Sequence, residues 1–178
     1  MTPPQDLRRS ATPPMDTREK ILSREGLQVV LDEHRRAGRT IVFANGVFDT
    51  LHAGHVRYLA AARAEGDLLV VGVNSDASTR RLKGEGRPIL TERARAGLVA
   101  ALASVDYVIL FEEPNAASLL REFEPHVHAK GTDYTSATLP EPERDAAALL
   151  GIRVAIVGDP KNHSTRDLLA RLRSGRNA

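Results

Sequence analysis

Short apolar runs alternate with segments of helical periodicity along most of the chain. The runs predict buried strands, and the segments between them carry apolar residues every three to four positions, as helices do. Strands are expected at residues 41–43, 68–73, 107–111, 126–129 and 153–157. Helices are expected to begin near His52, Thr91, Ala116, Pro142 and Ser164.

This alternation of strand and helix predicts the fold class. Strands that are connected through helices form a parallel sheet, and right-handed crossovers cover both of its faces. We therefore expect an α/β protein with a Rossmann-like, doubly wound five-stranded parallel sheet and helices on both faces. One further helix, between Ser23 and Gly38, precedes the first expected strand. Ligands of such folds bind at the carboxyl ends of the strands, so candidate chemistry is expected there.

The two ends of the chain differ from this central pattern. Residues 1–17 contain four prolines and almost no apolar periodicity, which predicts a disordered tail. Residues 18–178 are expected to form a single domain whose last residues, SGRNA, fray.

The composition narrows the class of function. The chain has no cysteine, which excludes disulfide scaffolds and cysteine-ligated metal sites. A net charge of +2 and an aromatic content of 4% argue against a nucleic-acid partner. Because no apolar run reaches about 18 residues, we expect a cytoplasmic protein without a membrane partner. A small polyanionic ligand is the favoured partner.

The end of the first main strand carries the most informative motif. His52 and His55 flank Gly54 at the start of the expected helix, and their spacing places both on one face of its first turn. Unpaired backbone N–H groups lie at such a helix start, and the missing side chain of Gly54 lets a phosphate approach them. The alternative is that both histidines cap the helix or lie on the surface. Bound zinc is not expected, because no glutamate accompanies the pair.

Basic residues follow the second main strand. They crowd a segment broken by Gly84 and Gly86, which predicts a mobile, positively charged loop that closes over a phosphorylated substrate. A solvated charged loop without a binding role is the alternative. The basic residues are Arg80, Arg81, Lys83 and Arg87, of which Lys83 and Arg87 are the favoured phosphate ligands.

Polar residues also follow the later strands. Lys130, Asp133 and Tyr134 surround Gly131 and can contact a sugar hydroxyl or a phosphate. His126 and His128 alternate along the preceding strand and are interpreted as packing and surface residues.

After the last strand, Ser164 and Asp167 fit a capping box at the start of a helix. Capping does not account for Thr165 and Arg166, so a nucleotide phosphate could bind at this helix start. His163 either lines the site or is exposed. Asp49 either fixes its own loop or binds a ligand directly.

These groups suit attack by an anionic nucleophile on the α-phosphate of a nucleoside triphosphate. Charge accumulates there on phosphoryl oxygens and on the departing pyrophosphate, so positioned donors supply most of the catalysis. A nucleophile that is itself a phosphate needs no general base.

Four segments of the chain carry a family resemblance: FANGVFDTLHAGH, NSDASTRRLKG followed by RP, KGTDY, and HSTRDLL. Over roughly residues 41–172 the chain resembles the cytidylyltransferase-like nucleotidyltransferase superfamily. It is most similar to the adenylyltransferase domain that transfers AMP from ATP to D-glycero-D-manno-heptose 1-phosphate. The products are pyrophosphate and the ADP-heptose used for lipopolysaccharide. The resemblance further implies Mg²⁺ held mainly by the nucleotide phosphates, and a homodimer.

The resemblance also implies a role for each motif residue. His52, His55 and Lys83 correspond to residues that bind the triphosphate and stabilise the transition state. The nucleotide-binding residues are Asn45, Gly46, Phe48, Asp49, Gly54, Ser164 and Thr165. The residues near the acceptor substrate are Arg87, Lys130 and Asp133.

Two other functions stay open from the sequence. A cytidylyltransferase acting on glycerol 3-phosphate or phosphoethanolamine has the same fold, but its RTEGISTT motif is replaced here by KNHSTRD. A non-catalytic nucleotide-binding module would keep the pocket without turnover. An aminoacyl-tRNA synthetase is excluded, because 178 residues leave no room for the parts that read the anticodon.

Overall fold

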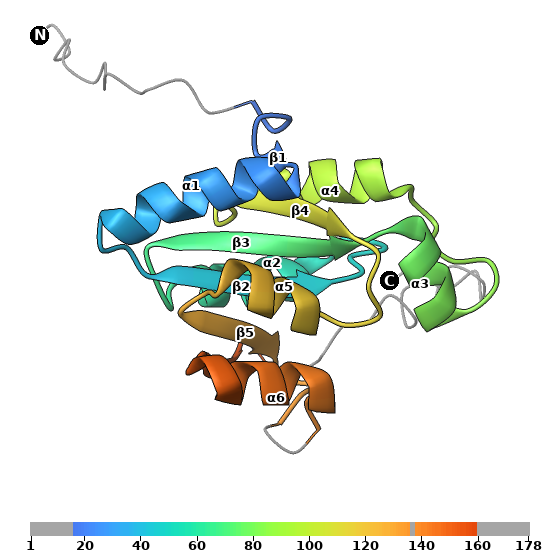
Figure 1. Cartoon of the computed structure of the whole chain (residues 1–178). Coiled ribbons are helices and arrows are strands. Elements are labelled where there is room, and N and C mark those ends of the chain that lie inside the picture. The colour runs from blue at the N-terminus through green and yellow to red at the C-terminus, as the bar shows by residue number, and fades with distance from the viewer. Residues whose placement is uncertain (1–15, 136–137, 160–178) are drawn as a thin grey trace, which may run out of the picture.

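A computed structural model describes residues 16–135 and 138–159, which form one parallel sheet with helices on both faces (Figure 1). The strands follow the order β1-β4-β3-β2-β5-β6, and every neighbouring pair is parallel. They are β1 (Ile21–Leu22), β2 (Ile41–Gly46), β3 (Leu68–Asn74), β4 (Tyr107–Phe111), β5 (Val127–Gly131) and β6 (Arg153–Val157). The predicted fold class is confirmed, but the sheet has six strands instead of five.

The additional strand β1 lies at one edge of the sheet. Ile21 and Leu22 pair with Val108 and Ile109 of β4, and the Lys20 ammonium donates to the Val105 carbonyl at 2.7 Å. A strand of two residues produces no readable alternation of apolar and polar positions, which is why the sequence pattern does not reveal it.

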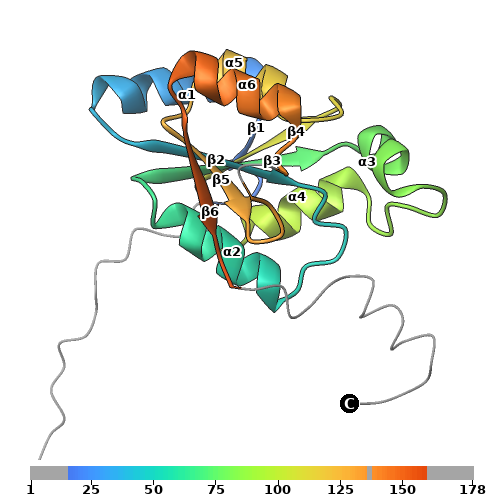
Figure 2. The ribbon, with the colours of Figure 1, turned by 90° about the horizontal axis from the view of Figure 1, so that it is seen from below.

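The helices divide between the two faces of the sheet. Figure 2 shows α1, α5 and α6 on one face and α2 and α4 on the other. Within residues 16–135 and 138–159 the helices are α1 (Arg24–Arg36), α2 (Ala53–Arg63), α3 (Asp76–Lys83), α4 (Glu92–Ala100), α5 (Ala117–Phe123) and α6 (Glu141–Leu150). Side-chain caps fix two of the expected starts, since Ser23 accepts from the Gly26 N–H and Thr91 accepts from the Ala94 N–H.

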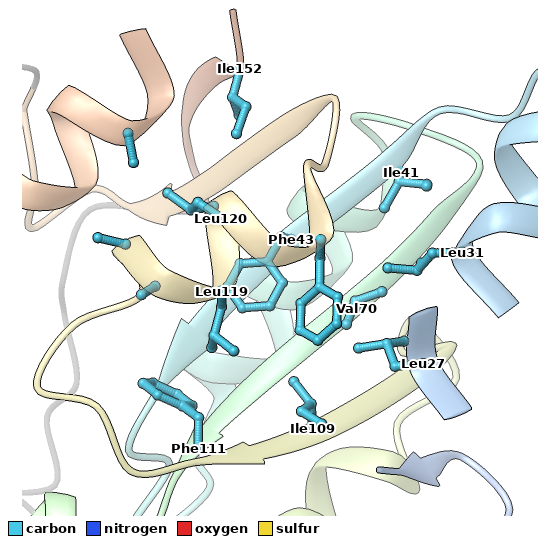
Figure 3. Close-up of a cluster of buried hydrophobic side chains, with 14 of the residues drawn as sticks. Leu27, Leu31, Ile41, Phe43, Val70, Ile109, Phe111, Leu119, Leu120 and Ile152 are labelled. Carbon is cyan, nitrogen blue, oxygen red and sulfur yellow. The ribbon is translucent and has the colours of Figure 1, made fainter. Parts of the chain in front are cut away.

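Each face of the sheet has its own apolar core. Figure 3 shows Phe43 and Ile109 of the sheet packed with Leu27 of α1 and Leu119 of α5. The opposite core joins strand residues such as Val71 to α2 and α4 through Leu59, Val99 and their neighbours. Because both faces are covered, the central strands read as continuous apolar runs.

Helix α3 corrects the expectation of a basic loop. Arg80, Arg81 and Lys83 lie in the last turn of this helix, where cations interact favourably with the helix dipole. Ser75 caps its start by accepting from the Ser78 N–H at 3.0 Å, and Gly84 ends it with a positive φ of 88°. Apolar periodicity does not predict this helix, because most of its residues are polar. Figure 1 shows it beyond the carboxyl end of β3.

The sheet order places a topological switch point between β2 and β5. From β2 the chain continues to β3 on one side and later returns to β5 on the other side. In open α/β sheets ligands bind in the crevice outside the carboxyl ends of such strands.

None of the helices in the described ranges is long and apolar enough to cross a membrane. Residues 1–15 of the tail expected over residues 1–17, the helix from Ser164 and residues 174–178 lie outside the described residues.

Candidate functional site

The connection from β2 to α2 is a tight turn in which a phenylalanine folds back over a glycine. Phe48 has a positive φ of 49° and is buried. A Cβ on Gly46 would lie 3.1 Å from the Phe48 ring, a tight contact that a side chain could make only if the ring shifted slightly. The Phe48 ring meets the His55 ring edge to face, with centroids 5.2 Å apart. The turn therefore places His55 by direct packing.

The two motif histidines lie together at the start of α2. Their rings stack with centroids 3.8 Å apart and an interplanar angle of 24°. His52 is the N-cap, and its carbonyl accepts from the N–H groups of His55 and Val56 at 2.9 and 3.3 Å. Gly54 lies between them in the first turn, where the helix dipole favours negative charge. The structure thus brings His52, Gly54 and His55 to one helix start at the carboxyl edge of the sheet.

Asp49 joins two segments that are far apart in the sequence. Its Oδ1 accepts from the Ile89 N–H at 2.6 Å, and its Oδ2 forms an ion pair with Arg87. The Asp49 side chain is 7% exposed and that of Arg87 22%. Both contacts tie the Asp49 carboxylate to the segment before α4, which is neither of the two roles expected from the sequence. Lys83 lies exposed at the end of α3, on the same edge of the sheet.

Arg95 is a site residue that the sequence analysis missed. Its guanidinium is fully buried and donates to the Val47 carbonyl at 2.6 Å and to the Leu90 carbonyl at 3.0 Å. It also pairs with Asp76 at 2.7 Å, at the start of α3. One side chain of α4 therefore ties together the three segments that carry His52, Lys83 and Arg87. The available signal was an arginine on the same helix face as the core residues Ala96 and Val99.

Four buried or half-buried polar residues form what we call the switch-point cluster: Asn45, His128, Lys130 and Glu143. Lys130 donates to Asn45 Oδ1 at 3.2 Å and pairs with Glu143 Oε2 at 2.7 Å. His128 Nε2 lies 3.2 Å from the same Asn45 oxygen. Glu143 Oε1 accepts from the Ala116 N–H at 3.0 Å, which connects the cluster to the start of α5. Glu143 was not singled out from the sequence, because its Glu- and Pro-rich surroundings are typical of an exposed loop.

Burial, with a smaller contribution from the Lys130 charge, lowers the pKa of His128 to about 3. The ring is therefore neutral at neutral pH. His128 packs against Phe43 with ring centroids 6.1 Å apart, as expected for a packing residue. His126 is exposed, and its Nδ1 accepts from the Ile41 N–H at 2.9 Å.

We predict that His128 makes the protein less stable in mild acid. Between its ordinary pKa of 6.5 and the folded value of about 3, the unfolded chain binds a proton that the folded protein does not bind. Stability therefore falls as the pH decreases through this window, by about 2 kcal/mol between pH 7 and pH 5. Urea unfolding across this range measures the effect. His128→Leu is expected to show a shallower pH dependence, and parallel curves for the two proteins would contradict the prediction.

The remaining predicted residues lie around the end of β5 or outside the described ranges. A Cβ on Gly131 would come within 2.8 Å of Asp133 Oδ1, so this glycine allows the close approach of the carboxylate. The Lys130 ammonium lies 4.8 Å from the centre of the Tyr134 ring. His163, Ser164, Thr165, Arg166 and Asp167 belong to the residues that are not described.

Comparisons with known proteins identify the family of the chain. The cytidylyltransferase-like family model matches residues 43–166. The protein named bifunctional protein HldE from Pelobacter propionicus is 46% identical over 157 residues, which are 88% of this chain and 32% of the relative. The HldE protein of Wolinella succinogenes is 53% identical over 119 residues, which are 67% of this chain and 25% of the relative. The chain thus spans about a third or less of these relatives.

A solved structure is also similar. The lipopolysaccharide core biosynthesis protein from Thermoplasma volcanium superposes with a TM-score of 0.57 at 34% sequence identity, and the match covers 69% of this chain and all of that chain. The family match extends from β2 through the histidine pair and the switch-point cluster. The chain therefore belongs to the cytidylyltransferase-like family.

Proposed function

We propose that the protein is a nucleotidyltransferase that transfers AMP from ATP to D-glycero-D-manno-heptose 1-phosphate, giving ADP-heptose and pyrophosphate. The observation that carries this proposal is the stacked His52 and His55 pair at the start of α2, on the carboxyl edge of the sheet. Similarity to HldE proteins and to a lipopolysaccharide core biosynthesis protein supports the choice of substrate.

In the proposed reaction a phosphate oxygen of the sugar attacks the α-phosphorus of ATP. A new phosphorus–oxygen bond forms, the bond from the α-phosphorus to the bridging oxygen breaks, and pyrophosphate leaves. Negative charge grows on the α-phosphoryl oxygens and on the leaving group, where imidazole and backbone N–H donors stabilise it. His52, His55 and the first turn of α2 supply these donors, and Lys83 adds a positive charge on the leaving side.

The other motif residues bind the two substrates in this proposal. Asn45, Gly46, Phe48, Asp49 and Gly54 shape the nucleotide loop, to which Ser164 and Thr165 of the last segment are added. Arg87 and Asp133 contact the acceptor, and Lys130 lies beside it. Arg87 and Asp49 form an ion pair, so the two substrate regions are mechanically connected.

Mg²⁺ fits this site if it is bound mainly by the phosphates of the nucleotide. Within residues 16–135 and 138–159 no group of three His, Asp or Glu side chains could hold a metal ion, and the Asp49 carboxylate is occupied by Arg87 and Ile89. Mg²⁺ commonly binds through substrate phosphates with few protein ligands. The ion would neutralise phosphate charge, while the chain supplies the donors described above.

We further propose that residues 18–178 form one domain that works in the cytoplasm as a homodimer, as the family resemblance implies. Its substrates are small molecules. Neither a nucleic acid nor a membrane is a partner in this proposal.

Pyrophosphate release with Mg²⁺ tests the proposed function. ATP, CTP, GTP and UTP are each combined with the α and β anomers of heptose 1-phosphate, with glycerol 3-phosphate and with phosphoethanolamine. Turnover is expected only with ATP and one heptose anomer. Turnover with CTP and glycerol 3-phosphate or phosphoethanolamine would replace the proposed product. Tight ATP binding without turnover on any acceptor would instead indicate a binding module.

A further inference from the structure

The switch-point cluster has a charge arrangement that changes the role of its lysine. The Lys130 ammonium is 2.7 Å from the Glu143 carboxylate, and the two side chains are only 4% and 2% exposed. A substrate phosphate could bind this ammonium only by competing with a carboxylate that is already buried against it. The positive charge of Lys130 is therefore already neutralised by the buried carboxylate of Glu143.

Lys130 and His128 both form a hydrogen bond with the side-chain oxygen of Asn45, which lies 3.2 Å from Lys130 Nζ and 3.2 Å from His128 Nε2. Lysine is only a donor, and a neutral histidine donates through one ring nitrogen, so both groups donate to this oxygen. If the Asn45 amide turned over, its NH₂ group would face the Lys130 ammonium, which cannot accept, and this hydrogen bond would be lost, whereas neutral His128 could accept through Nε2 in its other tautomer. Lys130 therefore selects one orientation of the amide, and His128 supports that orientation by donating to the same oxygen.

Glu143 keeps this arrangement in place from the other side. One of its oxygens pairs with Lys130, and the other accepts from the Ala116 N–H at the start of α5. The carboxylate thus holds the ammonium within reach of Asn45 and is itself held by the backbone. Asn45 is the half-buried member of the cluster, at the end of β2 and beside the switch point.

We propose that Lys130, His128 and Glu143 are positioning residues that orient the Asn45 amide, so that its NH₂ group donates to a substrate oxygen at the switch point. Lys130 then acts through Asn45 and does not bind the acceptor phosphate. The identity of the substrate, and nothing else in this inference, rests on the proposed function.

A cycle of variants tests whether Lys130 acts through Asn45. The Lys130→Met/Glu143→Gln pair removes both buried charges together, which avoids leaving one of them unpaired. With ATP and heptose 1-phosphate, this pair and Asn45→Ala are each expected to lower kcat about tenfold, with the acceptor KM changed less than about threefold. Combining them should add nothing to Asn45→Ala alone. Multiplicative losses, or a large rise in the acceptor KM, would overturn the proposal.

Glu143→Gln alone separates the two roles of Lys130 by the direction of the effect. If Lys130 bound the acceptor phosphate, freeing its charge would lower the acceptor KM. A positioning role predicts a lower kcat instead, because the ammonium loses the group that holds it. Arg144→Gln, an exposed neighbour on α6, is the matched control and should behave as the wild type.

NMR provides a readout that needs no substrate. Protein labelled with ¹⁵N at asparagine has five side-chain amides, and Asn45→Asp assigns the one of interest. The Asn45 amide signals are expected to shift or double in the Lys130→Met/Glu143→Gln pair and to stay in place in Arg144→Gln. Unchanged Asn45 signals in the pair would overturn the positioning role even in an active enzyme. A shifted signal in a protein inactive on every substrate would refute the proposed function only.

Discussion

His55→Ala and His52→Ala are each expected to lower turnover by about 10² or more, as is typical when a donor to the transition state is removed. The two rings stack 3.8 Å apart at the start of α2, so both can reach the same phosphoryl group. Because the lost interactions strengthen in the transition state, kcat should fall while ATP affinity changes little. Steady-state pyrophosphate release and calorimetric ATP titration measure the two quantities separately.

His34→Ala is the matched control for this pair. His34 lies in the last turn of α1, next to the Tyr107 ring and away from the carboxyl edge of the sheet. It should retain full turnover, and all three variants should keep melting temperatures close to that of the wild type. Turnover within about threefold of the wild type in both site variants would reject the role of the histidine pair.

Arg95→Met is expected to cost about 2–4 kcal/mol of the free energy of unfolding, because a fully buried guanidinium with three acceptors is removed, while its ionic partner Asp76 stays 31% exposed to solvent. The substitution keeps an unbranched side chain but leaves Asp76 and the carbonyls of Val47 and Leu90 without their shared donor. Turnover should fall as well, because the loops that carry His52 and Arg87 lose their common attachment. Urea unfolding and pyrophosphate release check the two effects.

Two variants of α4 make this prediction specific. Arg93→Met removes an exposed arginine from the same helix and should change stability by less than about 0.5 kcal/mol. Arg95→Lys keeps the charge but cannot reach three acceptors with a planar group, so an intermediate loss is expected. A loss below about 1 kcal/mol in Arg95→Met would show that the buried guanidinium does not hold the loops.

The sheet and most helices could be predicted because burial and capping leave local signals. Five strands coincide with apolar runs, and α4 follows its cap at Thr91 directly. Strand β1 and helix α3 left no such signal, since one has two residues and the other is mostly polar. Their positions depend on pairing with β4 and on capping by Ser75, which only the folded chain reveals.

The candidate site divides in a similar way. His52 and His55 are recognisable because, with Gly54, they lie within four consecutive positions at one helix start. Glu143 is recognisable only through partners that lie far away in the sequence, such as Lys130. Arg95 lies on the core face of its helix, which is a local signal, but its role is visible only through distant partners such as Val47. Long-range contacts of this kind turn an ordinary charged residue into a buried one, and no local pattern records them.

The Asp49 contacts also define what can be exchanged between relatives. Asp49 follows β2, whereas Arg87 and Ile89 precede α4, yet one carboxylate binds both of the latter. A chimera that takes residues 84–90 from another enzyme to change the acceptor would inherit a loop fitted to a different anchor. In protein engineering, the segments around Asp49 and Arg87 should therefore be exchanged together.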